Sequence, residues 1–123
     1  MDFDKLSNRV IGCAIEVHRF LGPGLLESAY EQCLAYELNK NNINFRLQQS
    51  VPVVYKDIKL DCGYRIDILV EDELIIELKS VKELSSIYHA QILTYMKLAH
   101  IKKGLLINFN VKLLKNGIKR FVI

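Results

Sequence analysis

The sequence predicts a mixed α/β domain in which helices pack on a central sheet. Apolar residues first recur at helical spacing, from about Asp4 to Phe20 and from about Leu25 to Asn39. From Phe45 onward they alternate, which is typical of strands, and a further helical segment then precedes a short apolar run. The chain has 123 residues, of which 50% are hydrophobic, so residues 1–123 are expected to form one domain with one core.

Two amphipathic helices are expected at the start of the chain. The segment Gly22-Pro23-Gly24 ends the first helix and separates it from the second. The apolar positions spaced by three or four residues are Leu6, Val10, Cys13, Ala14, Val17, Leu26, Tyr30, Cys33, Leu34 and Leu38. Each helix is therefore expected to bury one face.

The middle of the chain is expected to form strands. One strand runs from Phe45 to Tyr55, with Pro52 marking an edge or a bulge, and Ile58-Lys59-Leu60 leads into another. A hairpin follows, with strands from Tyr64 to Val70 and from Leu74 to Ser80. The residues between these two strands are all acidic and form the turn.

The last third is expected to add a helix and one or two strands. The helix starts at Ser85-Ser86 and continues to about Ile101. The nearly all-apolar run from Gly104 to Phe109 suits a strand buried on both faces. Lys115-Asn116-Gly117 has the Asn-Gly signature of a turn, and Ile118 to Ile123 forms a last strand.

Composition excludes several classes of protein. No apolar run reaches the length of a membrane span, and the first five residues are unlike a signal peptide, so a cytoplasmic protein that does not bind membranes is expected. The three cysteines and three histidines are scattered without zinc spacing, which favours reduced thiols and oxygen ligands for any metal. No Ser/His/Asp or Cys/His arrangement and no complete phosphate-binding loop is found.

Charge is unevenly distributed, although the net charge is only +3. From residue 81 onward Glu83 is the single acid. The basic residues of this region are Lys82, Lys97, Lys102, Lys103, Lys112, Lys115, Lys119 and Arg120. They either form a phosphate-binding surface or are solvated separately, and charge alone does not decide between these interpretations.

The hairpin carries the most informative residues. If its turn is Glu71-Asp72-Glu73, then Asp67 lies directly across from Glu77, and Lys79 shares the face of Glu77. Two opposed carboxylates favour a cation between them, and Mg²⁺ commonly takes one or two carboxylates while keeping several waters. A lysine on the same face can hold or activate a water beside the metal.

Two other interpretations of the hairpin remain open. A two-residue turn would shift the pairing by one and place Asp67 and Glu77 on opposite faces of the sheet. Alternatively, the two acids are solvated charges on an edge hairpin, with Lys79 as their salt-bridge partner.

Both flanking helices offer candidate site residues. Glu27 lies in the first turn of the second helix, where the helix dipole alone favours an acid, and Glu31 follows one turn later on the same face. Gln91 and Tyr95 project together from the third helix, either toward a bound nucleotide or water or as a polar edge of the core. His89 falls off that face and is expected to be structural or at the surface.

Taken together, these motifs resemble the PD-(D/E)XK nuclease superfamily. Asp67 followed by Glu77-x-Lys79 resembles its Asp…(Asp/Glu)-x-Lys signature, with Ile66 in place of the first proline. Gly24 to Tyr30 matches the Gly-x-x-Glu-x-x-Tyr motif of the small family named GxxExxY, which belongs to that superfamily. Gln91 to Tyr95 is similar to a Gln-x-x-x-Tyr helix in other branches, and Gly104 to Asn110 also resembles the family.

The resemblance implies a fold and a role for each of these residues. The expected fold is a restriction-endonuclease-like central mixed sheet flanked by helices. Asp67, Glu77 and the backbone carbonyl of Leu78 would bind Mg²⁺ or Mn²⁺, and Glu27 would complete the site directly or through water. Lys79 would orient or activate the attacking water, and Gln91 and Tyr95 would line the site.

The expected function is metal-dependent hydrolysis of nucleic acid, with DNA favoured. One alternative is a catalytically silent module on the same fold that binds nucleic acid or supports a partner enzyme. Because the chain has no room for a separate recognition domain, a homodimer or a protein partner is compatible with either function. The third alternative is an unrelated structural or interaction protein.

Overall fold

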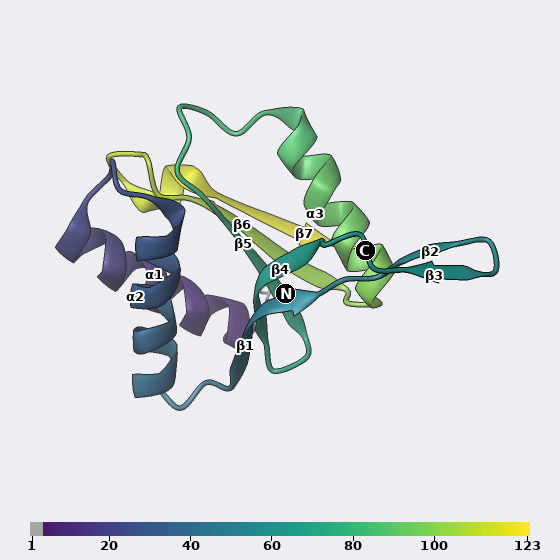
Figure 1. Cartoon of the computed structure of the whole chain (residues 1–123). Helices are drawn as coiled ribbons and strands as arrows, with labels where there is room; N and C mark the ends of the chain where they lie inside the picture. The colour runs from purple at the N-terminus through teal and green to yellow at the C-terminus, as the bar shows by residue number, and fades with distance from the viewer. Residues whose placement is uncertain (1–3) are drawn as a thin grey trace.

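Residues 4–123, which the computed structural model describes, form three α-helices around a five-stranded mixed sheet, with a separate two-stranded ribbon (Figure 1). The first three residues, on which the expected lack of a signal peptide partly rests, lie outside this description. The helices are α1 (Lys5–Leu21), α2 (Glu27–Lys40) and α3 (Ser86–Ala99). The strands are β1 (Phe45–Ser50), β2 (Val53–Tyr55), β3 (Ile58–Leu60), β4 (Arg65–Val70), β5 (Leu74–Lys79), β6 (Lys103–Asn108) and β7 (Ile118–Val122).

The large sheet has the strand order β1-β4-β5-β6-β7. Only the β5–β6 pair in it is parallel, and α3 makes the crossover that a parallel pair requires. Val70 pairs with Leu74, so the β4–β5 turn has the three residues that the sequence predicts. The hairpin lies inside the sheet, and the interpretation as an exposed edge hairpin is therefore wrong.

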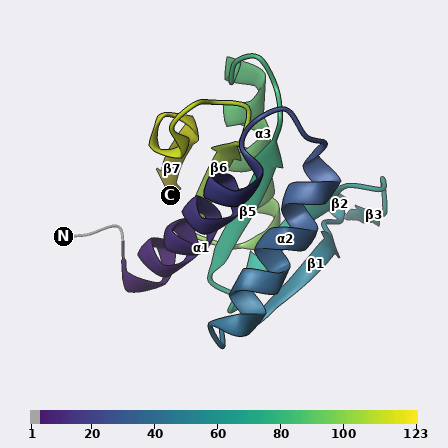
Figure 2. The ribbon, with the colours of Figure 1, turned by 90° about the vertical axis from the view of Figure 1, so that its left-hand side faces the viewer.

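The sheet separates two apolar layers. On one face, α1 and α2 lie side by side (Figure 2) and bury Val10 and Leu34 against Ile68 and Ile76. On the other face, α3 buries Met96 and its neighbours against Ile75 and Leu106. Because β5 and β6 are covered on both faces, most of their residues are apolar and buried, without the alternation of a half-exposed strand.

One predicted strand is divided into two. The segment from Phe45 to Tyr55 does not form a single strand, because the chain leaves the large sheet at Val51-Pro52. Proline has no N–H to donate to a ladder, and after it β2 pairs only with β3. The resulting β2–β3 ribbon projects from the body of the molecule (Figure 1).

The last connection is a tight one. The segment predicted as an Asn-Gly turn forms a short 3₁₀ helix, Leu114–Gly117, which packs against the end of β6. Gly117 is buried there, and a Cβ atom at this position would lie 2.2 Å from the carbonyl oxygen of Asn108. Only a glycine therefore fits at this point of contact.

Replacing Gly117 with alanine is expected to lower the free energy of unfolding by about 1–3 kcal/mol, because the added methyl group overlaps a backbone carbonyl. The matched control is Gly12→Ala in α1, where nothing lies within 4 Å of an added Cβ. This control is expected to raise the free energy of unfolding by about 0.5–1 kcal/mol, because alanine favours helix. Urea titration measures both, and an unchanged midpoint for Gly117→Ala would contradict the close contact.

Candidate functional site

The β4–β5 ladder opens at Asp67 and Glu77. The regular pairing of β4 with β5 ends at Ile68 and Ile76, and beyond this pair carboxylate oxygens take the place of backbone carbonyls. The amide of Asp67 donates to Glu77 Oε1 at 3.1 Å, and the amide of Leu78 donates to Asp67 Oδ2 at 2.8 Å. The carboxylates of Asp67 and Glu77 therefore lie together, and we call this pair the acidic centre. Each carboxylate keeps a second oxygen that accepts no hydrogen bond from a backbone amide of the ladder.

Glu77 is an unusually buried carboxyl group, with 5% of its surface exposed. Burial, which is the largest cause, and the negative charge of Asp67 together raise the pKa of Glu77 to about 8, against the opposing effects of the Asp67 amide and the Lys79 charge. Without a cation beside it, Glu77 therefore holds a proton at neutral pH.

Lys79 lies on the same face as Glu77 but does not pair with either acid. Its Nζ lies 4.9 Å from the centre of the Tyr88 ring, a cation–π contact with α3. Within residues 4–123, the Lys79 ammonium forms no ion pair, so the expected alternative of a Lys79 salt bridge is not what the structure contains.

Glu27 and Glu31 of α2 lie in different surroundings. Glu27 is the first residue of α2 and is exposed, and its carboxylate makes no hydrogen bond or ion pair with any described residue. Glu31, one turn later, accepts a 2.6 Å hydrogen bond from Gln48 Nε2, which also lies 3.4 Å from Asp67 Oδ1. Burial raises the pKa of Glu31, the Gln48 hydrogen bond opposes this rise, and the charge of Asp67 adds to it.

Gln48 is a site neighbour that sequence reasoning missed. It has a φ of 52° in the middle of β1, in the left-handed region that a non-glycine residue seldom adopts. The flanking pairs Leu47–Ile68 and Gln49–Ile66 place it opposite Asp67. The backbone distortion and the opened ladder thus meet at one point, and no residue type in the sequence indicates it.

α3 contributes the pair that the sequence predicts to project together. Gln91 Nε2 donates to the Tyr95 hydroxyl oxygen at 3.2 Å. Burial raises the pKa of Tyr95, the negative charge of Glu77 raises it further, and the Gln91 hydrogen bond opposes the rise. His89 instead packs edge-on against Phe121 of β7 at 5.6 Å, which is a structural contact.

The loop before α2 is tied to the end of β5. Tyr30 is fully buried and stacks on Phe109 at 4.3 Å, while its hydroxyl donates to the Gly22 carbonyl and accepts from the Leu25 amide. Ser80 Oγ donates to the Leu25 carbonyl at 2.6 Å. The tyrosine of the Gly24-to-Tyr30 segment is therefore structural, and it holds the residues before Glu27 against the strand that carries Lys79.

The side chain of Asn108, which the sequence analysis did not single out, fixes the chain after Lys79. The buried amide of Asn108 accepts from the Val81 N–H at 3.1 Å and donates to the Val81 carbonyl at 3.0 Å. Both backbone groups of Val81 are thus satisfied by one side chain of β6. The direction in which the chain leaves β5 is set by this contact.

The donors at the centre suit a hard cation. Two carboxylates that lie together are oxygen ligands that Mg²⁺ accepts, with waters completing its shell. The described part of the chain holds no group of three or more His, Cys, Asp or Glu side chains placed to bind a metal. A cation here would therefore rest on two carboxylates unless Glu27 or Glu31 moves.

Comparison with known proteins decides the family. The model of the PD-(D/E)XK nuclease superfamily matches residues 4–121. The chain belongs to this superfamily. No curated protein and no solved structure gives a significant match.

The architecture agrees with this membership. A five-stranded mixed sheet with helices on both faces is consistent with the restriction-endonuclease-like fold of the PD-(D/E)XK nucleases. Enzymes of this superfamily generally use divalent metals, and a nuclease superfamily implies a nucleic-acid substrate. None of the described helices is both long and apolar enough to cross a membrane.

In the presence of a chelator, the free energy of unfolding is expected to fall as the pH rises from about 4.5 to about 8. The pKa of Glu77 is raised in the folded state, so in this range the folded protein keeps a proton that the unfolded chain has released. The fall is at most about 1.4 kcal/mol for each pH unit, and it ends above pH 8.

Urea titration over a pH series measures this trend. Glu77→Gln is neutral at every pH and is expected to lose it, whereas Asp57→Asn, at an exposed position between β2 and β3, should keep it. A wild-type profile that is flat over this range would show that Glu77 is already ionised in the folded protein.

Proposed function

We propose that this PD-(D/E)XK protein hydrolyses phosphodiester bonds in nucleic acid, with DNA as the favoured substrate and Mg²⁺ or Mn²⁺ as the cofactor. The observation that supports this most is the opened β4–β5 ladder, where Asp67 and Glu77 lie together beside Lys79. We further propose that the chain belongs to the GxxExxY family, on the evidence of its Gly24-x-x-Glu27-x-x-Tyr30 segment.

The proposed metal ligands are Asp67, Glu77 and the Leu78 carbonyl. Glu27 is proposed to complete the site directly or through water, and Glu31, which shares the Gln48 amide with Asp67, is the competing candidate. When bound, the cation would acidify a water and neutralise charge that develops on the phosphate.

The chain's own residues would position the reactants. Lys79 carries the one positive charge on the Glu77 face of β5, so we assign it to orienting the attacking water and stabilising the phosphate. Its contact with Tyr88 restricts where the ammonium can lie. Gln91 and Tyr95 would border the same space from α3.

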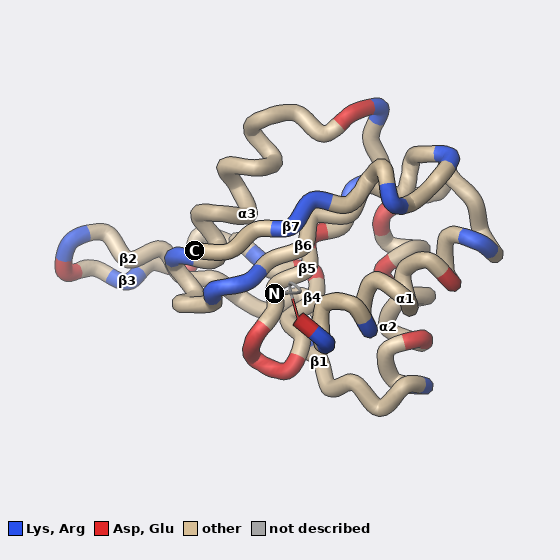
Figure 3. The backbone as a smooth tube through the Cα atoms, turned by 180° about the vertical axis from the view of Figure 1, so that it is seen from behind, with Lys and Arg blue, Asp and Glu red and all other residues tan. Residues whose placement is uncertain are grey.

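Basic residues beyond the centre can hold the nucleic-acid backbone. Glu77 pairs with Leu106, which in turn pairs with Lys119 of β7, so the exposed Lys119 lies on the same sheet face as the centre. Figure 3 shows basic positions along β7 and in the adjacent turn. Phosphate contacts of this kind position a strand without reading its sequence, so we expect weak sequence preference.

Replacing Lys79 with alanine is expected to lower the cleavage rate at least about 100-fold, because the positioned ammonium is lost from the centre. The measurement uses labelled linear, nicked, branched and single-stranded DNAs with Mn²⁺. Thermal melting and metal binding should change little, and Lys40→Ala, an exposed lysine at the end of α2, is the matched control. Cleavage by the Lys79 variant at the wild-type rate would refute the mechanism.

Binding of Mg²⁺ or Mn²⁺ at pH 7 is expected to release about one proton, because the pKa of Glu77 is about 8 before the cation arrives. Calorimetry in buffers of different ionisation enthalpy counts this proton. Glu77→Gln should bind without proton release, and Asp67→Asn should bind more weakly. A heat that does not depend on the buffer would argue against Glu77 as a ligand.

The second candidate function is a catalytically silent module that binds nucleic acid or supports a partner, either alone or as a homodimer. The observation that favours it is that no third carboxylate of the described chain joins Asp67 and Glu77 in a metal-binding group. A DNA affinity that is the same with and without divalent metal, and that Asp67→Ala does not change, would support this function over hydrolysis.

A further inference from the structure

Two segments, residues 51–53 and 61–64, join the β2–β3 ribbon to β1 and β4, and we call them the neck of the ribbon. An apolar groove of about 570 Å³ lies between this neck and α3. Its volume falls within the roughly 300–1,000 Å³ that is usual for ligand sites. The residues that matter for the argument are Val53 and Tyr64 from the neck, and Tyr88, Gln91, Tyr95 and Leu98 from α3.

The groove continues from the candidate centre. Tyr88 lines the groove and also carries the Lys79 ammonium on its ring. Tyr95 and Gln91 also line the groove, and the Gln91 amide donates to the Tyr95 hydroxyl. A phosphate held at Lys79 would therefore have the groove directly beside it.

The side chains that line the groove suit a flat aromatic group that is attached to a negatively charged chain. Tyr64, Tyr88 and Tyr95 line the groove, and the rings of Tyr64 and Tyr95 lie 6.1 Å apart with an angle of 54° between their planes. No acidic side chain is among the lining residues, so nothing in the walls repels a phosphate. Bases stack on aromatic side chains regardless of sequence, and an amide such as that of Gln91 can bond to a base edge.

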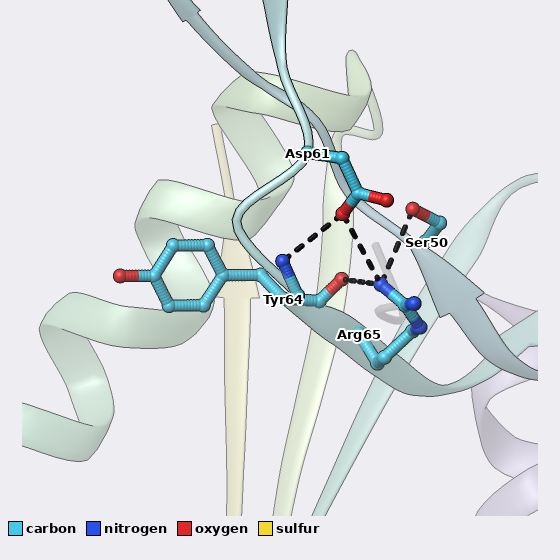
Figure 4. Close-up of polar contacts among 5 residues, drawn as sticks. Ser50, Asp61, Tyr64 and Arg65 are labelled. Atoms are coloured by element: carbon cyan, nitrogen blue, oxygen red, sulfur yellow. Dashed lines mark hydrogen bonds and ion pairs between the residues drawn. The ribbon is translucent and has the colours of Figure 1, made fainter.

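The neck of the ribbon is held in place. Arg65 Nη1 donates to Ser50 Oγ at 3.3 Å and to the Tyr64 carbonyl at 3.0 Å, and it lies 3.7 Å from Asp61 Oδ1. Asp61 also accepts from the Gly63 amide at 3.0 Å. Figure 4 shows the Tyr64 ring extending away from the Arg65 guanidinium. Tyr64 is 45% exposed, and these contacts fix its backbone in the absence of any ligand.

We propose that this groove binds an unpaired base of the strand whose phosphate lies at Asp67, Glu77 and Lys79, so that the substrate has a single-stranded segment. The proposal rests on the proposed nuclease function and narrows its substrate class. A paired base is covered by its neighbours in the stack and would have to leave the helix to enter, at a cost in free energy.

The test uses a short single strand that contains 2-aminopurine, whose fluorescence is quenched by stacking, and the same strand in a blunt duplex. EDTA prevents metal-dependent cleavage during the measurement. The wild type and Tyr64→Phe should bind the single strand with quenching. Tyr64→Ala should bind it roughly tenfold more weakly with little quenching, as expected for one lost stacking partner. Tyr36→Ala, which removes a 66% exposed tyrosine of α2, is the matched control and should behave as the wild type.

Several outcomes would overturn the proposal. Unchanged binding and quenching by Tyr64→Ala would do so, and so would equal binding of duplex and single strand with the same dependence on Tyr64. A change of oligomeric state in Tyr64→Ala without an effect on DNA would identify the groove as a protein interface instead.

The two proposals fail separately. If Lys79→Ala abolishes DNA cleavage but Tyr64→Ala changes the cleavage rate of no substrate, the base-binding groove is refuted and the nuclease function is supported. Binding of single strands that depends on Tyr64, without metal-dependent cleavage of any DNA, would refute the nuclease function and keep the groove.

Discussion

Two backbone amides in the middle of the sheet, those of Asp67 and Leu78, donate to carboxylates instead of to the carbonyls of a neighbouring strand. This exchange lets β4 and β5 separate without leaving buried donors unsatisfied, which would otherwise cost about 1–3 kcal/mol each. It also holds two acids against each other at a depth where one of them retains its proton. The strand geometry and the electrostatics of the centre thus have a common origin.

The surrounding contacts serve this opening. Tyr30 and Ser80 hold the loop before α2, and Asn108 holds the chain after β5. Each contact joins a side chain to a backbone group of a loop, so the position of each loop is fixed by a residue outside its hydrogen-bonded segment. The polar residues beside the centre are therefore supported by elements that are themselves buried in the core.

Local patterning predicts most of the fold, whereas tertiary packing decides the remainder. The hairpin register follows from its turn length and alternation, and the buried β6 follows from its continuous apolar run. Gln48 could not be found in this way, because nothing about a glutamine in a strand indicates a positive φ. Helical periodicity places Glu27 and Glu31 on one face but cannot say which turn meets β4. Pro52 marks an interruption, but only the folded chain shows that β2 leaves the sheet.

The stacking of Tyr30 on Phe109 joins the first third of the chain to the last. The acidic hairpin pairs residues that are close in the sequence, so its pairing needs little loop closure. Tyr30, which holds the loop before α2, finds its stacking partner only once the chain beyond β6 is present. Contacts between distant segments must first overcome the entropy of loop closure. A nascent chain that ends before β6 therefore carries the two acids without the contacts that surround them, and we expect the complete centre to assemble late in folding.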